Sequence, residues 1–150
     1  MQRLLPPNLF LIAVITMITV SWMMPTEPFL SFLSFPLTLL GLIPLIVGLG
    51  LSIRGSMKFS RVGTNIKPFN QPNVLVTDGL FRYSRNPMYL GFVIALCGVA
   101  LLLGSVPALL IALAFAIVTD RWYIQFEERA MTRQFGQQYK TYQAQTRRWV

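Results

Sequence analysis

The chain has 150 residues, of which 54% are hydrophobic and only 12% charged, and its mean hydropathy of +0.56 is too high for a soluble globular domain of this size. Its net charge is +8, it has no histidine, and Cys97 is its single cysteine, which excludes a disulfide framework and a Cys/His metal site. The composition predicts one membrane domain over residues 1–150, whose basic charge reflects topology and membrane lipids rather than nucleic-acid binding.

Three segments contain no Asp, Glu, Lys or Arg: residues 8–24, 29–53 and 86–119. A helix needs about 20 apolar residues to cross a bilayer, so each of the first two segments fits one span. The third would form a helix of about 51 Å, which is much longer than the hydrocarbon core of about 30 Å. It must therefore fold back, and Gly104 and Pro107 mark the turn. We expect an all-α integral membrane protein with four transmembrane helices, over about 8–24, 29–53, 87–104 and 107–124.

The basic residues set the expected orientation of these spans. With four spans, the N-terminus, residues 54–86 and the C-terminal tail lie on the same side, and these three parts, together with Arg121 at the adjoining end of the fourth span, contain all 13 lysines and arginines. By the positive-inside rule that side is cytoplasmic. We therefore predict a multi-pass membrane protein with both termini in the cytoplasm and with the first span retained as an anchor.

The segment 54–86 is predicted to be an ordered, irregular cytoplasmic loop, because glycines, prolines and asparagines recur along it. A loop of this length usually has a functional reason. At its end, Pro87 suits the first turn of a helix and Asn86 its N-cap, which leaves backbone N–H groups free to bind an anion beside Arg82 and Arg85. The simpler interpretation is that these arginines mark the cytoplasmic end of a span.

The tail 125–150 is expected to begin as a helix that continues the fourth span, because residues 120–134 contain neither Gly nor Pro. Glu127 and Glu128 lie on it, and no cation stands three or four positions from either. The simpler interpretation is a solvated helix face. The alternative is a site for a cation that comes from the loop or from a ligand, so that the loop and this cytoplasmic helix form one pocket.

The second expected span contains Gly48 and Gly50, separated by one leucine. Small residues let helices approach closely in lipid, which is one interpretation. The other is that the missing side chains leave room for a flat ligand against the helix.

Three groups of residues, taken in order, resemble the isoprenylcysteine carboxyl methyltransferase and phospholipid methyltransferase superfamily. They are Leu75-Val-Thr77-Asp-Gly79, then Arg85-Asn-Pro87-Met-Tyr89-Leu-Gly91, then Glu127-Glu128 followed by Phe135-Gly136, Tyr139 and Tyr142. The resemblance covers roughly residues 41–147. It implies an enzyme that uses S-adenosylmethionine, without a metal, to methylate a lipophilic or lipidated substrate that comes from the bilayer.

The resemblance also implies which residues form the site. The cofactor is expected to lie against Gly48, Gly50, Thr77, Gly79, Arg85, Asn86, Pro87, Tyr89, Gly91, Glu127 and Glu128. Catalysis is expected to depend on Arg85, Tyr89 and Glu128, with Glu128 on the cofactor's ammonium and Arg85 on an anionic group. Asn86 stands where the family has histidine, so it can exchange hydrogen bonds but cannot act as a base.

The methyl acceptor stays open at this point. An isoprenylcysteine-type carboxylate needs no base, whereas a phospholipid-type amine must lose a proton. We expect the acceptor to enter from the bilayer through a lateral groove near Tyr89, Gly91 and Phe92.

Two other functions are disfavoured by the sequence. A membrane NADPH-dependent reductase of the sterol-reductase type is disfavoured, because the segment 126–128 lacks the tail element of those enzymes. A small four-span transporter without enzymatic activity is also disfavoured. Such proteins usually carry an ionisable residue in the middle of a span, and none of the expected spans has one there.

Overall fold

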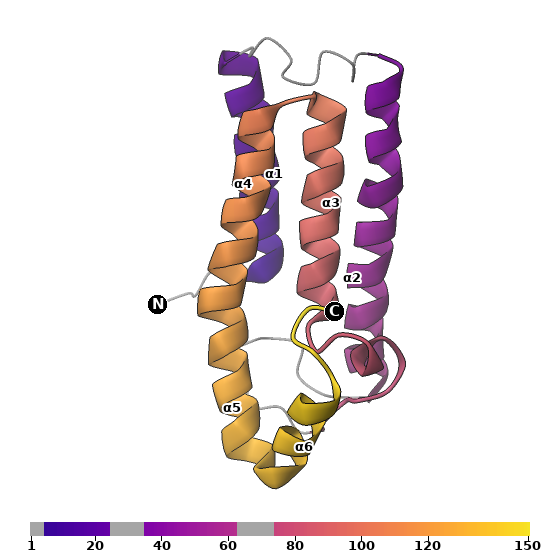
Figure 1. The fold of residues 1–150 in the computed structure, drawn as a ribbon, viewed down its shortest axis with the longest axis vertical. Coiled ribbons are helices and arrows are strands. Elements are labelled where there is room, and N and C mark those ends of the chain that lie inside the picture. The colour runs from indigo at the N-terminus through magenta and orange to yellow at the C-terminus, as the bar shows by residue number, and fades with distance from the viewer. Residues whose placement is uncertain (1–4, 25–34, 63–73) are drawn as a thin grey trace.

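The computed structural model describes residues 5–24, 35–62 and 74–150, and every regular element within them is a helix. The four long helices of the bundle are α1 (Pro6–Met23), α2 (Leu42–Val62), α3 (Pro87–Leu103) and α4 (Val106–Val118) (Figure 1). The remaining elements are the 3-10 turns η1 (Leu37–Gly41) and η2 (Gly79–Arg82), the π-helical segment η3 (Thr119–Ile124), and the helices α5 (Gln125–Phe135) and α6 (Gln137–Gln145). The predicted all-α class is confirmed.

Three helical stretches are long and apolar enough to cross a membrane: Pro6–Met23, Leu37–Arg61 and Val106–Phe135. The fourth apolar helix, α3, has 17 residues, which is at the short end of the range for a span. The protein therefore has three to four helices capable of spanning a membrane, as expected for an integral membrane protein. Part of the predicted second span, residues 29–34, lies outside the described residues.

Helix α3 lies at the centre of the bundle, where it contacts α1, α2 and α4, whereas α2 packs on α3 at one edge (Figure 1). The core between α1, α3 and α4 is apolar, and Phe10 stacks on Phe92 with ring centroids 4.9 Å apart. Many large apolar side chains on the outside of α1, α2 and α4 are exposed, as suits helices surrounded by lipid. Phe92 thus packs against the core with its ring partly buried.

Helices α2 and α3 approach closely because small residues face one another. A Cβ atom on Gly48 would collide with the backbone of Gly91 and Ala95, and one on Gly91 would collide with Ser52. Ser52 Oγ also donates a hydrogen bond of 2.8 Å to the Met88 carbonyl. The space beside Gly91 is therefore filled by α2, and the predicted groove at this position is wrong. Gly50, in contrast, faces open space, because a Cβ atom added there would meet no atom within 4 Å.

The helix before the predicted loop is longer than the sequence indicated. Helix α2 continues through Val62, so the prediction of irregular structure from Arg54 is wrong. Gly55 does not end the helix, because it serves close packing: a Cβ there would lie 2.7 Å from Met88 Cγ. Residues 63–73 of the predicted loop lie outside the described residues, and the chain re-enters as an irregular stretch at 74–78 before η2.

The turn between the third and fourth apolar helices is confirmed. Gly104 ends α3 with a left-handed φ of 58°, a conformation that favours glycine. Ser105 then caps α4, because its side chain accepts a hydrogen bond from the Ala108 N–H.

The helical continuation of the fourth span is also confirmed, because α4, η3 and α5 form one continuous helix from Val106 to Phe135. At 1.5 Å per residue this helix is about 45 Å long, so one end must extend beyond a hydrocarbon core of about 30 Å. The charged end is α5, which carries Glu127, Glu128, Arg129 and Arg133. Gly136 then reverses the chain, and α6 folds back beside α5 (Figure 1).

Candidate active site

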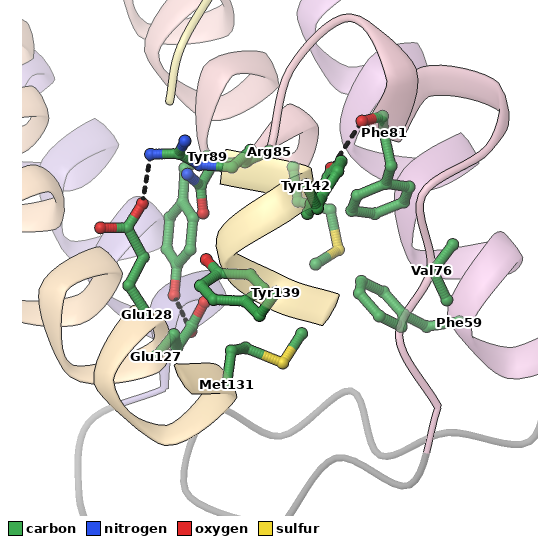
Figure 2. Close-up of a pocket in the computed structure, with 12 residues that line it drawn as sticks. Phe59, Val76, Phe81, Arg85, Tyr89, Glu127, Glu128, Met131, Tyr139 and Tyr142 are labelled. Carbon is green, nitrogen blue, oxygen red and sulfur yellow. Dashed lines mark hydrogen bonds and ion pairs between the residues drawn. The ribbon is translucent and has the colours of Figure 1, made fainter. Parts of the chain in front are cut away.

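A pocket lies where the beginning of α3 meets α5 and α6, at the end of the bundle opposite the Gly104 turn (Figures 1 and 2). Its lining combines an aromatic and thioether wall with a small set of charged and polar groups. The lining residues are Phe59, Val76, Phe81, Arg85, Asn86, Met88, Tyr89, Glu127, Glu128, Met131, Tyr139 and Tyr142.

The pocket brings together five of the residues predicted from the sequence, namely Arg85, Asn86, Tyr89, Glu127 and Glu128. The others lie outside its lining. Pro87 is buried in the first turn of α3, and Thr77 and Gly79 are exposed on the preceding segment. Gly48 and Gly91 lie between α2 and α3, and Gly50 faces away from α3.

The Arg85 side chain is held by hydrogen bonds to α5, to α6 and to the residue that follows α6. Its Nη2 donates to Glu128 Oε1 at 2.8 Å, and its Nη1 donates to the carbonyls of Gln143 at 3.0 Å and Thr146 at 2.8 Å. Its Nε is buried and has no hydrogen-bond partner among the residues that the structure describes. A buried guanidinium N–H without an acceptor is costly, so this atom is suited to an anionic group of a ligand.

Glu128 is held by two arginines. Besides Arg85 on Oε1, Arg148 donates from Nη2 to Oε2 at 2.6 Å and from Nε to Oε1 at 3.3 Å. Only 12% of the Glu128 side chain is exposed, and the hydrogen bond to Glu128 raises the pKa of Arg148 above its usual value. Of the two interpretations of the Glu127–Glu128 pair, the structure supports a contact with a cation from the loop, which Arg85 makes with Glu128.

Glu127 has different surroundings, although it is the neighbouring residue. Its Oε1 accepts a hydrogen bond of 2.5 Å from Tyr89 OH, and no cation contacts it within the described ranges (Figure 2). Burial raises the pKa of Glu127 to about 7, and the charge of Glu128 adds to this, although the Tyr89 hydrogen bond opposes it. A carboxyl group in this state gains from a cationic ligand, which would favour its ionised form.

The opposite wall of the pocket is aromatic. Phe59 and Phe81 meet edge to face with centroids 4.9 Å apart, and Tyr139 and Tyr142 lie beside them (Figure 2). Tyr142 OH donates a hydrogen bond of 2.5 Å to the Phe81 carbonyl, which ties α6 to η2. Burial raises the pKa of Tyr142 to about 12, so this phenol stays protonated at neutral pH.

Sequence reasoning missed the partners that η3 and the C-terminal residues supply. Arg148 bridges Glu128 and Asp120, with Nη1 3.3 Å from Asp120 Oδ1, and Trp149 Nε1 donates to the same Asp120 oxygen at 2.9 Å. Asn86 Nδ2 donates to the Arg148 carbonyl at 3.0 Å, so its side chain holds the C-terminal residues.

In the sequence, Arg148 stands out only as one of the basic residues on the predicted cytoplasmic side. The lack of a local cation beside Glu128 is the signal that points to a partner elsewhere in the chain.

Comparisons with known proteins indicate the family and the fold of the chain. A family model described as phospholipid methyltransferase matches residues 37–138. The chain is similar to a protein-S-isoprenylcysteine O-methyltransferase of Schizosaccharomyces pombe, with 31% identity over 93 residues, which are 60% of this chain and 37% of that protein. It is also similar to protein-S-isoprenylcysteine O-methyltransferase A of Arabidopsis thaliana, with 34% identity over 107 residues, which are 68% of this chain and 53% of that protein.

Among solved structures, the chain is similar to the eukaryotic intramembrane Ras methyltransferase ICMT (isoprenylcysteine carboxyl methyltransferase). The TM-score is 0.67 and the sequence identity 22%, and the match covers 95% of this chain and 50% of that one. This likeness establishes a shared fold. The chain spans from about a third to about half of the length of these relatives.

Proposed function

Because the chain belongs to the phospholipid methyltransferase family, we propose that it transfers the methyl group of S-adenosylmethionine to a lipophilic acceptor in the membrane. The observation that supports this proposal is the pocket with Arg85, Tyr89 and Glu127. These three residues lie within the region that the family model matches, at the charged end of an apolar bundle. A site at that position can hold a polar cofactor next to the bilayer.

The residues of the pocket fit the cofactor. S-adenosylmethionine has a carboxylate, an ammonium and an adenine ring, and the pocket offers a group for each. The buried Arg85 Nε would bind the carboxylate, Glu127 the ammonium, and the aromatic wall with Phe59 and Tyr139 the adenine. When bound, the cofactor supplies an electrophilic methyl group on a sulfonium that becomes a neutral thioether.

The role given to Glu128 from the sequence changes in this proposal. Glu128 already accepts hydrogen bonds from Arg85 and Arg148, so a further cation would have to displace one of them. Glu127 has no such partner in the described part of the chain, and Tyr89 orients its carboxylate. We therefore assign the cationic group of the cofactor to Glu127, and to Glu128 the task of holding Arg85.

The chain's own contribution to methyl transfer is then mainly positional. In-line displacement requires the donor and the acceptor to be held in one orientation away from water. Arg85, Glu127 and Tyr89 are fixed by short hydrogen bonds and so suit this purpose. We favour a carboxylate of the isoprenylcysteine type as the acceptor, because the two curated relatives carry that name and because a carboxylate needs no base.

Calorimetry and labelling test the proposal on purified protein in detergent. Wild-type protein should bind S-adenosylmethionine and S-adenosylhomocysteine, and a bound ligand should raise the melting temperature. In vesicles, the labelled methyl group should reach a farnesylcysteine analogue as a base-labile ester. A base-stable label on a phospholipid would instead identify an amine acceptor. The absence of cofactor binding at millimolar concentration would contradict the proposal.

A further inference from the structure

The last residues of the chain are tied to the beginning of α3. The C-terminal segment, defined as residues 146–149, follows α6, and its first residue, Thr146, has an extended backbone. The Arg85 N–H donates to the Arg147 carbonyl at 3.0 Å, and Arg85 Nη1 donates to the Thr146 carbonyl at 2.8 Å. Together with the Asn86 bond to the Arg148 carbonyl, these contacts fix the backbone of the C-terminal segment beside the pocket.

Two side chains of the C-terminal segment, those of Arg148 and Trp149, contact the long helix that contains α4, η3 and α5. Arg148 binds Glu128 through two nitrogens and reaches Asp120 with a third, at 3.3 Å from Oδ1 and 3.4 Å from Oδ2. Trp149 Nε1 holds Asp120 Oδ1 from the other side, at 2.9 Å. Asp120 and Glu128 are therefore joined by one planar guanidinium, a geometry that lysine cannot reproduce.

Loss of the positive charge of Arg148 would change the positions of the charged residues that line the pocket. Arg85 and Arg148 share the carboxylate of Glu128, and their side chains are 11% and 33% exposed. Without Arg148, Glu128 would lose its bidentate partner and could rotate about its side-chain bonds. Arg85 would then lose its fixed anion, and its guanidinium would be held less firmly beside the pocket. A loosened Glu128 would also compete with Glu127 for a cationic ligand.

We propose that Arg148, itself fixed by Asp120 and Trp149, is a positioning residue that holds Glu128 and Arg85 in the geometry required for cofactor binding. This proposal rests on the proposed function. Arg148 lies beyond residues 37–138, so the match to the family does not include it. The C-terminal segment thus completes a site whose other charged residues all lie in the matched region.

Cofactor affinity tests the proposal. Arg148→Ala should weaken S-adenosylhomocysteine binding at least tenfold in calorimetry, measured well below the melting temperature. The affinity of Arg148→Lys for S-adenosylhomocysteine should lie between those of Arg148→Ala and wild type, because lysine keeps the charge but loses the planar contact with two carboxylates. Arg129→Ala is the control, since it removes the same charge from an exposed side chain on α5. Binding by Arg148→Ala within twofold of wild type would overturn the proposal.

A double-mutant cycle separates positioning from a general loss of stability. If Arg148 acts through Glu128, the variant with both Arg148→Ala and Glu128→Gln should bind no more weakly than the worse single variant. If the two effects on affinity multiply, Arg148 acts independently of Glu128 and the proposal is wrong.

The geometry can also be tested without a cofactor. The chain has three tryptophans, so Trp22→Phe with Trp122→Phe leaves Trp149 as the only tryptophan fluorophore. In that background, Asp120→Asn and Arg148→Ala should shift the Trp149 emission to longer wavelength, whereas Arg129→Ala should not. Unchanged emission would refute the clamp, by which we mean the contacts that join Arg148 and Trp149 to Asp120. A wild-type protein that binds no cofactor but shows these shifts would refute the proposed function and leave the clamp in place.

Discussion

Glu127 and Glu128 are adjacent on α5, yet only Glu128 is neutralised by contacts with cations from the described part of the chain. Arg85 and Arg148 both bind Glu128, whereas Glu127 contacts the neutral phenol of Tyr89. Successive residues on a helix point about 100° apart, so two neighbouring carboxylates can meet different elements. The pair therefore divides into one group with a structural task and one that is available to a ligand.

The two carboxylates should respond differently to the same substitution. Glu127→Gln should weaken cofactor binding by about 1.5–3 kcal/mol, the range for a charged hydrogen bond, without lowering the melting temperature. Glu128→Gln should lower the melting temperature, because removing one partner of a mostly buried ion pair costs about 3–5 kcal/mol. Calorimetry and thermal unfolding on both variants measure this. Equal losses of stability would contradict the division.

Stability without ligand should depend on pH through Glu127. Its carboxyl group has an ordinary pKa of 4.5, and burial raises the pKa to about 7 in the folded protein. Because the folded state binds this proton more tightly, the free energy of unfolding should fall as the pH rises from about 4.5 to about 7, and then level off. The contribution is about 3 kcal/mol. Unfolding at pH 5 and pH 7.5 should show a smaller decrease in Glu127→Gln, and an identical decrease would count against the assignment.

At the scale of the elements, the contact surface between α2 and α3, called the seam here, determines the distance between the two helices. Gly48 and Gly91 face each other across it, and Gly50 does not take part. The sequence pattern of two glycines allowed both a packing role and a ligand role, because it contains no information about which face of α2 meets another helix. The structure shows that Gly48 packs on α3.

Gly48 and Gly50 form a matched pair for a test of this seam. Gly48→Ala should destabilise the protein by about 1–3 kcal/mol, because the new methyl group must push α3 away. Gly50→Ala should be neutral or stabilising by up to about 1 kcal/mol, because alanine favours the helix and meets no atom there. Melting temperatures in one detergent measure both. A larger loss in Gly50→Ala would show that the seam has been placed on the wrong face.

At the scale of the whole molecule, the fold was predictable where the membrane restricts the sequence. Long stretches without charge and the Gly104 and Pro107 turn correctly indicated apolar helices and where two of them join. The end of α2 was not predictable from the sequence. A glycine often ends a helix, whereas Gly55 lies within α2 and packs against Met88. The contact of Arg148 with Glu128 joins residues that are 20 positions apart in sequence, and nothing in the local pattern of either predicts it.

The orientation of the bundle is a prediction that labelling can test. The exposed Met24 lies at the end of α1, and the exposed Ser60 lies near the end of α2, on the side of the pocket. In a Cys97→Ser background, Met24→Cys should react with an impermeant maleimide on intact cells. Ser60→Cys and Arg147→Cys should react only after the cells are opened. The reverse pattern would place the pocket outside the cell.

The π-helical segment η3 links the direction of the carboxylates to the number of residues that precede them. A π-helix forms hydrogen bonds from i to i+5 and so is wound more loosely than the α-helices on either side. Loss of one residue within Thr119–Ile124 would let the helix tighten, and each residue of an α-helix turns about 100°. Because a π-helical turn holds one residue more than an α-helical turn, the tightening would absorb the loss and Glu127 would still face Tyr89. A relative with an uninterrupted α-helix here would keep the same pocket with one residue fewer, so a one-residue gap at this position in an alignment would mark a change in winding rather than a lost site.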